Sequence, residues 1–296
     1  MEFKEELKKY QQQVNQKLLK YLYTNECLES ELNKSFEYSL MAGGKRIRPI
    51  LVIATFALFS DDFEKCIDYA VAIEMVHNFS LIHDDLPAID NDDYRHGKLT
   101  NHKKFNESTA ILAGDRLLNE AYKIISGNLI KEQNNKVLNL KLKVFNEFSI
   151  AVERMIAGEY VDTEFEGKSI TEKELEYIHI NKTGALLRLS ARMGAIIAGA
   201  SDIDISNITT YAEKIGLAFQ IKDDILSEEG TFEELGKPIG NDKELEKCTY
   251  VSLYGLESAK NILKETVDEA INAINIYGDK AEFLKELAKY IMNRNK

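Results

Sequence analysis

Helix-breaking residues are scarce in this chain, and their scarcity constrains the fold more than any other sequence feature. The 296 residues include only three prolines and sixteen glycines, while 44% are apolar. Apolar side chains recur at steps of three and four residues in the stretches 142–156 and 256–274, as they do on one face of a helix. No stretch alternates apolar and polar residues in the manner of a strand. We therefore predict one all-α domain over residues 1–296, built from roughly ten or more helices.

Local composition divides this helical chain further. The stretch 184–200 is rich in alanine, glycine, leucine and isoleucine, which indicates a helix buried on most sides with closely packed neighbours. The stretches 91–106 and 227–243 are polar and contain glycine, so we predict long loops there. A short surface turn is predicted at 132–136, and no internal repeat is present.

Charge and cysteine content narrow the class of protein. The net charge of −11 argues against nucleic acid as a general partner, because binding to a phosphate backbone needs a basic surface. Cys27, Cys66 and Cys248 are odd in number and have no C-x-x-C spacing, which is typical of reduced thiols. The charged N-terminus has no apolar signal-peptide region, and the apolar stretches are too short to span a membrane. We expect a cytoplasmic protein without a membrane span.

An acidic cluster follows an apolar, helix-like run at residues 79–82. It contains Asp84, Asp85 and Asp90. Burying neighbouring carboxylates without a counter-charge is costly, so a positive group is expected beside them. Magnesium favours a few carboxylates together with phosphate oxygens. Pro87 disfavours continuation of the helix, so we predict that the chain bends there and returns Asp90 towards Asp84.

A second acidic cluster, Asp223 and Asp224, lies far along the chain in another helical pattern. At 100° per residue, Asp223, Asp224 and Ser227 share one helix face and can point at one ligand. The alternative is a pair of solvated aspartates near a helix end, and the spacing alone leaves both open.

Basic residues supply the complementary charge. Three cations follow two glycines in the segment 43–49, and glycine lets backbone amides approach an anion. His77 lies two helical turns before Asp84, on nearly the same face. The segment 182–184 opens the buried helix, where an anion would gain from the helix dipole. A basic loop is often merely solvated and a lone histidine is often structural. Together, however, these groups indicate metal-dependent chemistry on a diphosphate that carries an apolar group.

From about residue 36 to residue 270, the chain resembles the trans-isoprenyl diphosphate synthases, in particular bacterial short-chain farnesyl diphosphate synthases. The resemblance rests on five ordered motifs, namely 43–49, 84–90 with Arg95, 182–183, 219–224 and 235–237. It implies an all-α helical bundle around a deep central cavity, paired as a homodimer. It also implies condensation of isopentenyl diphosphate with dimethylallyl or geranyl diphosphate to give farnesyl diphosphate. The cofactor it implies is Mg²⁺, with three ions when substrate is bound.

The resemblance also assigns roles to single residues. The implied catalytic residues are Asp84, Asp85, Lys182, Thr183, Gln220 and Asp223. The implied metal ligands are Asp84, Asp85, Asp90, Asp223 and Asp224. The implied ligands of isopentenyl diphosphate are Lys45, Arg48 and His77, and those around the allylic diphosphate are Arg95, Lys182, Gln220 and Lys237. Thr183 and Gln220 would stabilise the allylic cation, and His96 would join the substrate-binding set. Phe79 would form the cavity floor that limits the product to fifteen carbons, although it also suits an ordinary core position.

Three positions depart from the family pattern, and they keep other functions open. His96 stands where a second arginine is usual, Ser227 where an aspartate is usual, and Glu159 where a glutamine is usual. Glu228 or Glu229 is a candidate replacement for the lost carboxylate. The alternatives are a non-catalytic or modulatory partner subunit, a geranylgeranyl diphosphate synthase, and a class I terpene cyclase. A cyclase, however, would not need the Lys45, Arg48 and His77 set.

Overall fold

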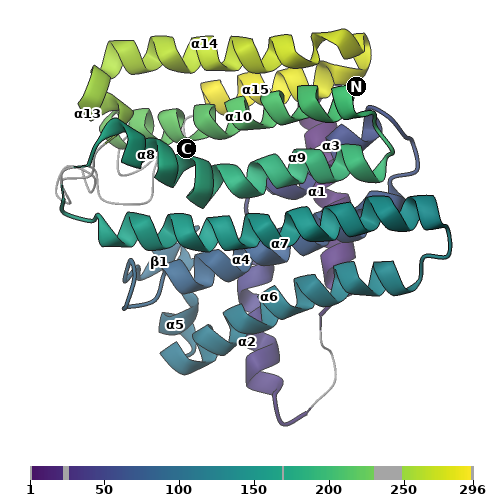
Figure 1. Cartoon of the computed structure of the whole chain (residues 1–296). Coiled ribbons are helices and arrows are strands. Elements are labelled where there is room, and N and C mark those ends of the chain that lie inside the picture. The colour runs from purple at the N-terminus through teal and green to yellow at the C-terminus, as the bar shows by residue number, and fades with distance from the viewer. Residues whose placement is uncertain (1, 23–26, 169, 230–248, 295–296) are drawn as a thin grey trace. The chain divides into compact units, whose positions relative to one another are not determined.

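The computed structural model describes residues 2–22, 27–168, 170–229 and 249–294. Two compact units divide the chain, and each is described by itself. The first unit consists of Met1–Ile53 and Asp61–Phe145, and the second of Ala54–Ser60 and Asn146–Lys296. The all-α prediction is confirmed for the described residues (Figure 1). The prediction of a single domain over residues 1–296 stays a prediction.

Helices dominate both units. Those of the first unit are α1 (Phe3–Leu19), α2 (Ser30–Leu40), α4 (Glu64–Asp84), α5 (Asn101–Lys104) and α6 (Glu107–Ile130), with the strands β1 (Tyr94–Arg95) and β2 (Lys98–Leu99). Two helices contribute to both units, α3 (Ile47–Ala57) and α7 (Asn135–Glu164). Those of the second unit are α8 (Glu172–Ile178), η1 (His179–Gly184), α9 (Ala185–Ile197), α10 (Asp202–Glu229), α13 (Tyr250–Tyr254), α14 (Leu256–Ile274), η2 (Asn275–Ala281) and α15 (Glu282–Asn293).

The central helix of the first unit is α4, which packs against α1, α2 and α6. Its sequence is apolar on almost every side, and most of its side chains from Cys66 to Phe79 are buried. A helix that is apolar all round is stable only when neighbours cover it on several sides. The helix ends at Asp84, as the nearby Pro87 predicts. This burial fixes α4, and with it the position of the acidic cluster at its end.

The segment 91–106 is not the long loop that its composition predicts. β1 and β2 pair as a short antiparallel hairpin, with Arg95 opposite Lys98. His96 and Gly97 form its two-residue turn and have positive φ values of 52° and 74°. The hydroxyl of Thr100 donates to the Asp92 carbonyl at 2.7 Å and closes the hairpin at its base. The hairpin therefore gives Arg95 and His96 defined positions.

In the second unit, α10 packs along α9, α14 and α15 (Figure 1). The periodic stretch 256–274 forms α14, and most of the stretch 184–200 forms the mostly buried α9, as predicted. A Cβ added at Gly216 would lie 3.4 Å from the Gly184 Cα, so small residues do allow close helix approach here. The predicted loop at 227–243 is wrong at its start, because α10 continues to Glu229.

The prediction of a helix N-terminus at Lys182–Gly184 is also wrong. These residues belong to the π-helix η1, which continues directly from α8 into α9, and Gly184 has helical angles of −64° and −36°. The backbone amides there lie inside a continuous helical stretch, so they do not form the open end that binds an anion. Single π-turns inside α-helices are frequent at functional sites.

The cysteines and the apolar helices bear on two further expectations. Cys27 and Cys66 are free thiols, one exposed and one buried, whereas Cys248 lies outside the described residues. Over the described ranges, no helix combines the length and the apolar character needed to cross a membrane.

Candidate active site

The basic segment 43–49 leads from α2 into α3, and it sends its cations in two directions. Arg46 points inward and is buried, with a left-handed φ of 55°. Its guanidinium donates to Glu74 Oε1 at 2.5 Å, to the Leu40 carbonyl at 2.7 Å and to Asn15 Oδ1 at 3.1 Å. These contacts satisfy a buried charge, so Arg46 is a structural cation and not a ligand-binding one.

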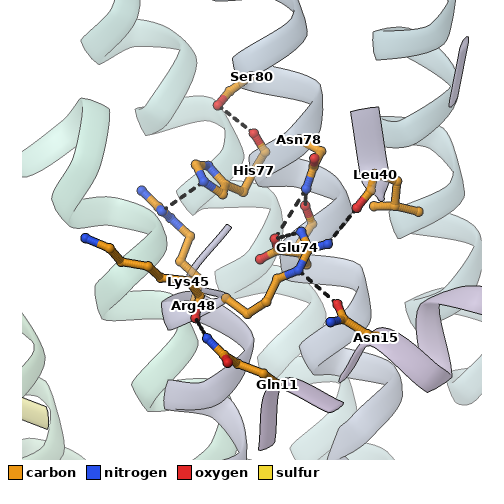
Figure 2. A network of polar contacts seen from close by, with 10 residues as sticks. Gln11, Asn15, Leu40, Lys45, Arg48, Glu74, His77, Asn78 and Ser80 are labelled. Atoms are coloured by element: carbon orange, nitrogen blue, oxygen red, sulfur yellow. Dashed lines mark hydrogen bonds and ion pairs between the residues drawn. The ribbon is translucent and has the colours of Figure 1, made fainter. Parts of the chain in front are cut away.

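The other two cations of this segment extend to one side of the network, away from Glu74 (Figure 2). Arg48 Nη1 lies 3.3 Å from His77 Nε2 on α4. The carbonyl of Lys45 accepts from the Gln11 side chain of α1 at 3.0 Å, which fixes the backbone of the segment. The structure thus brings Arg48 and His77 together and places Lys45 on the same side.

His77 is a neutral member of this group. Burial lowers its pKa well below the ordinary value, and Arg48 and Arg95 lower it further. The neutral ring accepts a hydrogen bond from Arg48 through Nε2, so the remaining proton sits on Nδ1. His77 therefore offers a neutral N–H donor on the same side as the cations Arg48 and Lys45, and such a set suits a phosphate group.

The acidic cluster lies at the end of α4, two turns after His77. The chain bends after Asp84, and the Asp90 backbone amide donates to the Asp84 carbonyl at 2.9 Å. The predicted return of Asp90 towards Asp84 is therefore confirmed. Asp85 is buried and accepts from Arg95 Nε at 2.7 Å, while Asp90 is exposed. Burial lowers the pKa of Arg95, but its hydrogen bond and ion pair with Asp85 outweigh burial and leave the pKa raised.

His96 lies at the tip of the hairpin, close to the basic segment. A Cβ placed on Gly44 would lie 3.9 Å from His96 Nε2. Desolvation lowers the pKa of His96, and Arg95, Arg46 and Lys45 add to this effect. The ring is therefore uncharged at neutral pH, and it contributes less to anion binding than an arginine would.

Phe79 is 7% exposed and faces His83 one turn along α4, with ring centroids 4.8 Å apart. Gly114 on α6 allows this arrangement, because a Cβ there would lie 2.3 Å from His83 Nε2. Phe79 therefore sits one turn before the acidic cluster, and its role as a floor stays a prediction.

In the second unit, Lys182 is held by two carboxylates of α7. Its Nζ lies 2.9 Å from Glu159 Oε2 and 2.5 Å from Asp162 Oδ2. Burial alone would lower the pKa of Lys182, but the two carboxylates outweigh it and raise the pKa. Gly158 permits the close approach, since a Cβ there would lie 2.2 Å from the Lys182 backbone nitrogen.

The second acidic cluster lies within α10, in a helical frame as predicted. Asp223 pairs with Arg294 at 2.5 Å, and Asp224 accepts from the Tyr250 backbone amide at 2.7 Å. Gln220 lies one turn before Asp224 on α10, and Thr183 follows Lys182 in η1. Glu229 pairs with Lys260 of α14 at 2.7 Å, so its carboxylate already has another partner. Lys237 lies outside the described residues. The two acidic clusters belong to different units, so their joint action on one ligand stays a prediction.

The polyprenyl synthetase family matches residues 29–289. The chain belongs to the polyprenyl synthetase family. It is 44% identical over 270 residues to the farnesyl diphosphate synthase of Micrococcus luteus, covering 90% of this chain and 91% of that protein.

Two other similar proteins differ in the products that their names state. The geranylgeranyl diphosphate synthase of Cyanophora paradoxa is 44% identical over 299 residues, covering 96% of this chain and 98% of that protein. The crystal structure of an FPP/GFPP synthase from Zymomonas mobilis has a TM-score of 0.86 at 33% identity, covering 98% of each chain.

The carboxylates of the two acidic clusters fit magnesium. Among the described residues, no three histidine, cysteine or acidic side chains already form a metal-binding group. A magnesium ion does not require one, because it takes one or two carboxylates and completes its shell with water and substrate phosphate. Asp84 is partly exposed and Asp90 exposed at the bend, and the Asp223 side chain is 45% exposed, so each suits that partial role.

Several residues that shape the site escaped sequence reasoning. Asp162 shares a face of α7 with Glu159 three residues earlier, a spacing that could have indicated the pair around Lys182. Glu74 gives a weaker signal, as an acidic residue inside an apolar helix. Arg294 lies 71 residues from Asp223, and no local pattern connects them.

Proposed function

We propose that this chain is a short-chain prenyltransferase that joins isopentenyl diphosphate to dimethylallyl or geranyl diphosphate and yields farnesyl diphosphate. One observation carries the proposal, the contact of Arg48 with neutral His77 two turns before an acidic bend that is anchored by Arg95. His77 and Asp84 thus share α4, with Arg48 in contact with His77 and Arg95 in contact with Asp85. Membership in the polyprenyl synthetase family supports the reaction class.

The basic set would bind isopentenyl diphosphate. Lys45 and Arg48 supply positive charge, and neutral His77 supplies an N–H donor. Arg95, Lys182, Gln220 and Lys237 would surround the allylic diphosphate. To bind the allylic diphosphate, Lys182 would exchange part of its contact with Glu159 and Asp162 for phosphate oxygens.

Asp84, Asp85, Asp90, Asp223 and Asp224 would hold three magnesium ions together with the substrate. Asp84 and Asp90 are accessible in the first cluster, whereas Asp85 is buried in its pair with Arg95 and would act there mainly through that arginine. When bound, the ions would neutralise the leaving diphosphate and so favour ionisation of the allylic carbon–oxygen bond.

The chain's own residues would then guide the carbon chemistry. The oxygens of Thr183 and Gln220 would stabilise the allylic cation, and apolar surroundings would keep water from it. The isopentenyl double bond attacks the cation and forms the new carbon–carbon bond. Each turnover releases one inorganic diphosphate, because one allylic carbon–oxygen bond breaks for each carbon–carbon bond that forms. One proton is then lost from the coupled product, by family analogy to the departing diphosphate.

Product length is the finer part of the proposal. Phe79 is bulky, buried and one turn before the acidic cluster, which favours fifteen carbons. The similarity to the geranylgeranyl diphosphate synthase of Cyanophora paradoxa makes a twenty-carbon product the second candidate.

An incubation with purified protein separates the functions under consideration. The protein is mixed with magnesium, labelled isopentenyl diphosphate and geranyl diphosphate, and the products are resolved by chromatography. Farnesyl diphosphate supports the proposal, and a twenty-carbon diphosphate supports the second candidate. A non-catalytic subunit would give no product, and a terpene cyclase would give a hydrocarbon from a prenyl diphosphate alone.

We also propose a cytoplasmic homodimer, following the family resemblance. Sedimentation equilibrium should give twice the mass of the chain. A monomer mass at micromolar concentration would contradict this assembly without affecting the proposed chemistry.

A further inference from the structure

Arg294 follows α15 and lies against the second acidic cluster. Its Nη2 donates to Asp223 Oδ1 at 2.5 Å and to the Phe219 carbonyl at 3.1 Å. The guanidinium carbon lies 4.0 Å from the centre of the Phe219 ring, within the range of a cation–π contact. An arginine thus occupies one oxygen of an aspartate that the family resemblance assigns to a metal.

The two partners differ in exposure. The Arg294 side chain is 7% exposed, whereas Asp223 retains 45% exposure. The carboxylate is therefore reachable from solvent while the arginine covers part of it. A second cation can approach Asp223 without first unfolding α10.

The pairing of Arg294 is also less complete than that of the structural cation Arg46. All three kinds of nitrogen in Arg46 donate to protein acceptors, and its partner Glu74 is equally buried. Arg294 Nε is buried without a hydrogen-bond partner among the described residues. A buried donor without a partner is costly, so this guanidinium is held less firmly than that of Arg46.

We propose that Arg294 is a displaceable counter-ion that neutralises Asp223 when no metal is bound and competes with a divalent cation for it. The inference rests on the proposed function, in which Asp223 is a metal ligand. If Arg294 competes in this way, it lowers the affinity of the second cluster for metal. That cluster has Ser227 in place of a third carboxylate, so the loss of any Asp223 oxygen weighs more heavily there.

The test is a direct binding measurement. Free Mn²⁺ is followed by electron paramagnetic resonance in the presence of inorganic diphosphate, for the unmodified chain and for Arg294→Gln. We expect Arg294→Gln to bind Mn²⁺ about tenfold more tightly, which corresponds to about 1.4 kcal/mol. Arg188→Gln is the matched control, because Arg188 pairs with Glu213 in the same unit and its loss removes the same charge. Unchanged or weaker Mn²⁺ binding in Arg294→Gln would overturn the proposal.

A double variant shows whether the effect passes through Asp223. Asp223→Asn should abolish the gain, so Arg294→Gln in that background should leave Mn²⁺ affinity unchanged. A gain that persists there would overturn the proposal, since it would reflect general charge removal.

Thermal unfolding separates a displaceable ion from a purely structural one. Arg294→Gln should lower the melting temperature without metal, and the difference should shrink at saturating Mn²⁺ with diphosphate. An equal loss in both conditions would mean a structural role and would overturn the proposal.

If the chain makes no prenyl product but Arg294→Gln still tightens Mn²⁺ binding, the counter-ion stands and the proposed function fails. If the chain makes prenyl product but Arg294→Gln leaves Mn²⁺ binding unchanged, the counter-ion proposal fails and the proposed function stands.

Discussion

Single side chains predicted to meet substrate or metal are already paired with opposite charges inside the protein. Arg95 pairs with Asp85, Lys182 with Glu159 and Asp162, and Asp223 with Arg294. Each pair offsets part of the cost of burying a charge. Ligand binding at these residues therefore exchanges one partner for another, and the strength of the internal pair helps to set the affinity.

Glu159→Gln tests this exchange at Lys182. The glutamine removes one of the two carboxylates around the ammonium group, so Lys182 should be released more easily to a diphosphate. We expect the KM for geranyl diphosphate to fall by about two- to fivefold, the effect of one partly exposed ion pair. Steady-state kinetics at saturating isopentenyl diphosphate measure it.

Glu164→Gln is the matched control for this variant, because Glu164 is exposed on the same helix. Its KM should stay the same. If the KM for geranyl diphosphate rises in Glu159→Gln, Glu159 orients Lys182 and does not restrain it.

Phe79→Ala tests the chain-length role. Removing the ring one turn before the acidic cluster opens space along α4, so products longer than fifteen carbons should appear in chromatography. Phe79→Tyr keeps the ring and should leave product length unchanged. An unchanged product from Phe79→Ala would return Phe79 to the role of an ordinary core residue.

At the scale of elements, the π-helix η1 determines where Lys182 lies. It continues from α8 to α9, and α7 approaches it closely at Gly158. Two glycines in long helices differ in the space available for a side chain. A Cβ at Gly158 would clash with the backbone of Lys182, whereas a Cβ at Gly127 in α6 would meet nothing within 4 Å.

Alanine at these two positions should give effects of opposite sign. Gly158→Ala should lower the free energy of unfolding by about 1–3 kcal/mol, because the backbone must shift to make room. Gly127→Ala should raise it by about 0.5–1 kcal/mol, the usual difference between alanine and glycine within a helix. Urea unfolding measures both, and a stabilising Gly158→Ala would contradict the close contact of α7 with η1.

His179 in η1 makes the stability of the fold depend on pH. Its ring is buried against Tyr250, with centroids 5.7 Å apart, and burial lowers its pKa from 6.5 to about 4. The unfolded chain takes up this proton near pH 6.5 and the folded chain does not. Stability is therefore lost as pH falls from 6.5 towards 4.

His179→Phe should keep the stacking and remove this acid sensitivity. Between pH 7 and pH 5, the unmodified chain should lose about 2 kcal/mol more unfolding free energy than the variant. Urea unfolding at the two pH values measures the difference. Equal losses in both proteins would show that the His179 proton does not contribute.

Sequence reasoning found the long elements because their signals extend over many residues. The apolar repeat of α14 and the buried composition of α9 both span several turns. The hairpin β1–β2 has strands of two residues, which are too short for an alternating pattern to appear. The π-helix escaped because Lys182 and Gly184 resemble a helix start, while the backbone before them is already helical. The Arg294 contact depends on tertiary packing alone.

At the scale of the whole molecule, the chain carries a net charge of −11 but concentrates cations where a diphosphate is expected. Lys45, Arg48 and Arg95 all belong to the first unit, and Arg95 pairs with Asp85 at the acidic bend. An acidic surface repels anionic substrates at long range, so metal ions and these local cations have to supply the attraction. Activity should therefore depend strongly on the divalent ion.

The most direct test of the proposed chemistry is the stoichiometry of one reaction. Purified protein is supplied with isopentenyl diphosphate, geranyl diphosphate and Mg²⁺, and both farnesyl diphosphate and inorganic diphosphate are quantified over time. We predict equal amounts of the two products and no reaction when the metal is chelated. Release of inorganic diphosphate without a fifteen-carbon diphosphate, or no consumption of isopentenyl diphosphate at all, would contradict a prenyltransferase function.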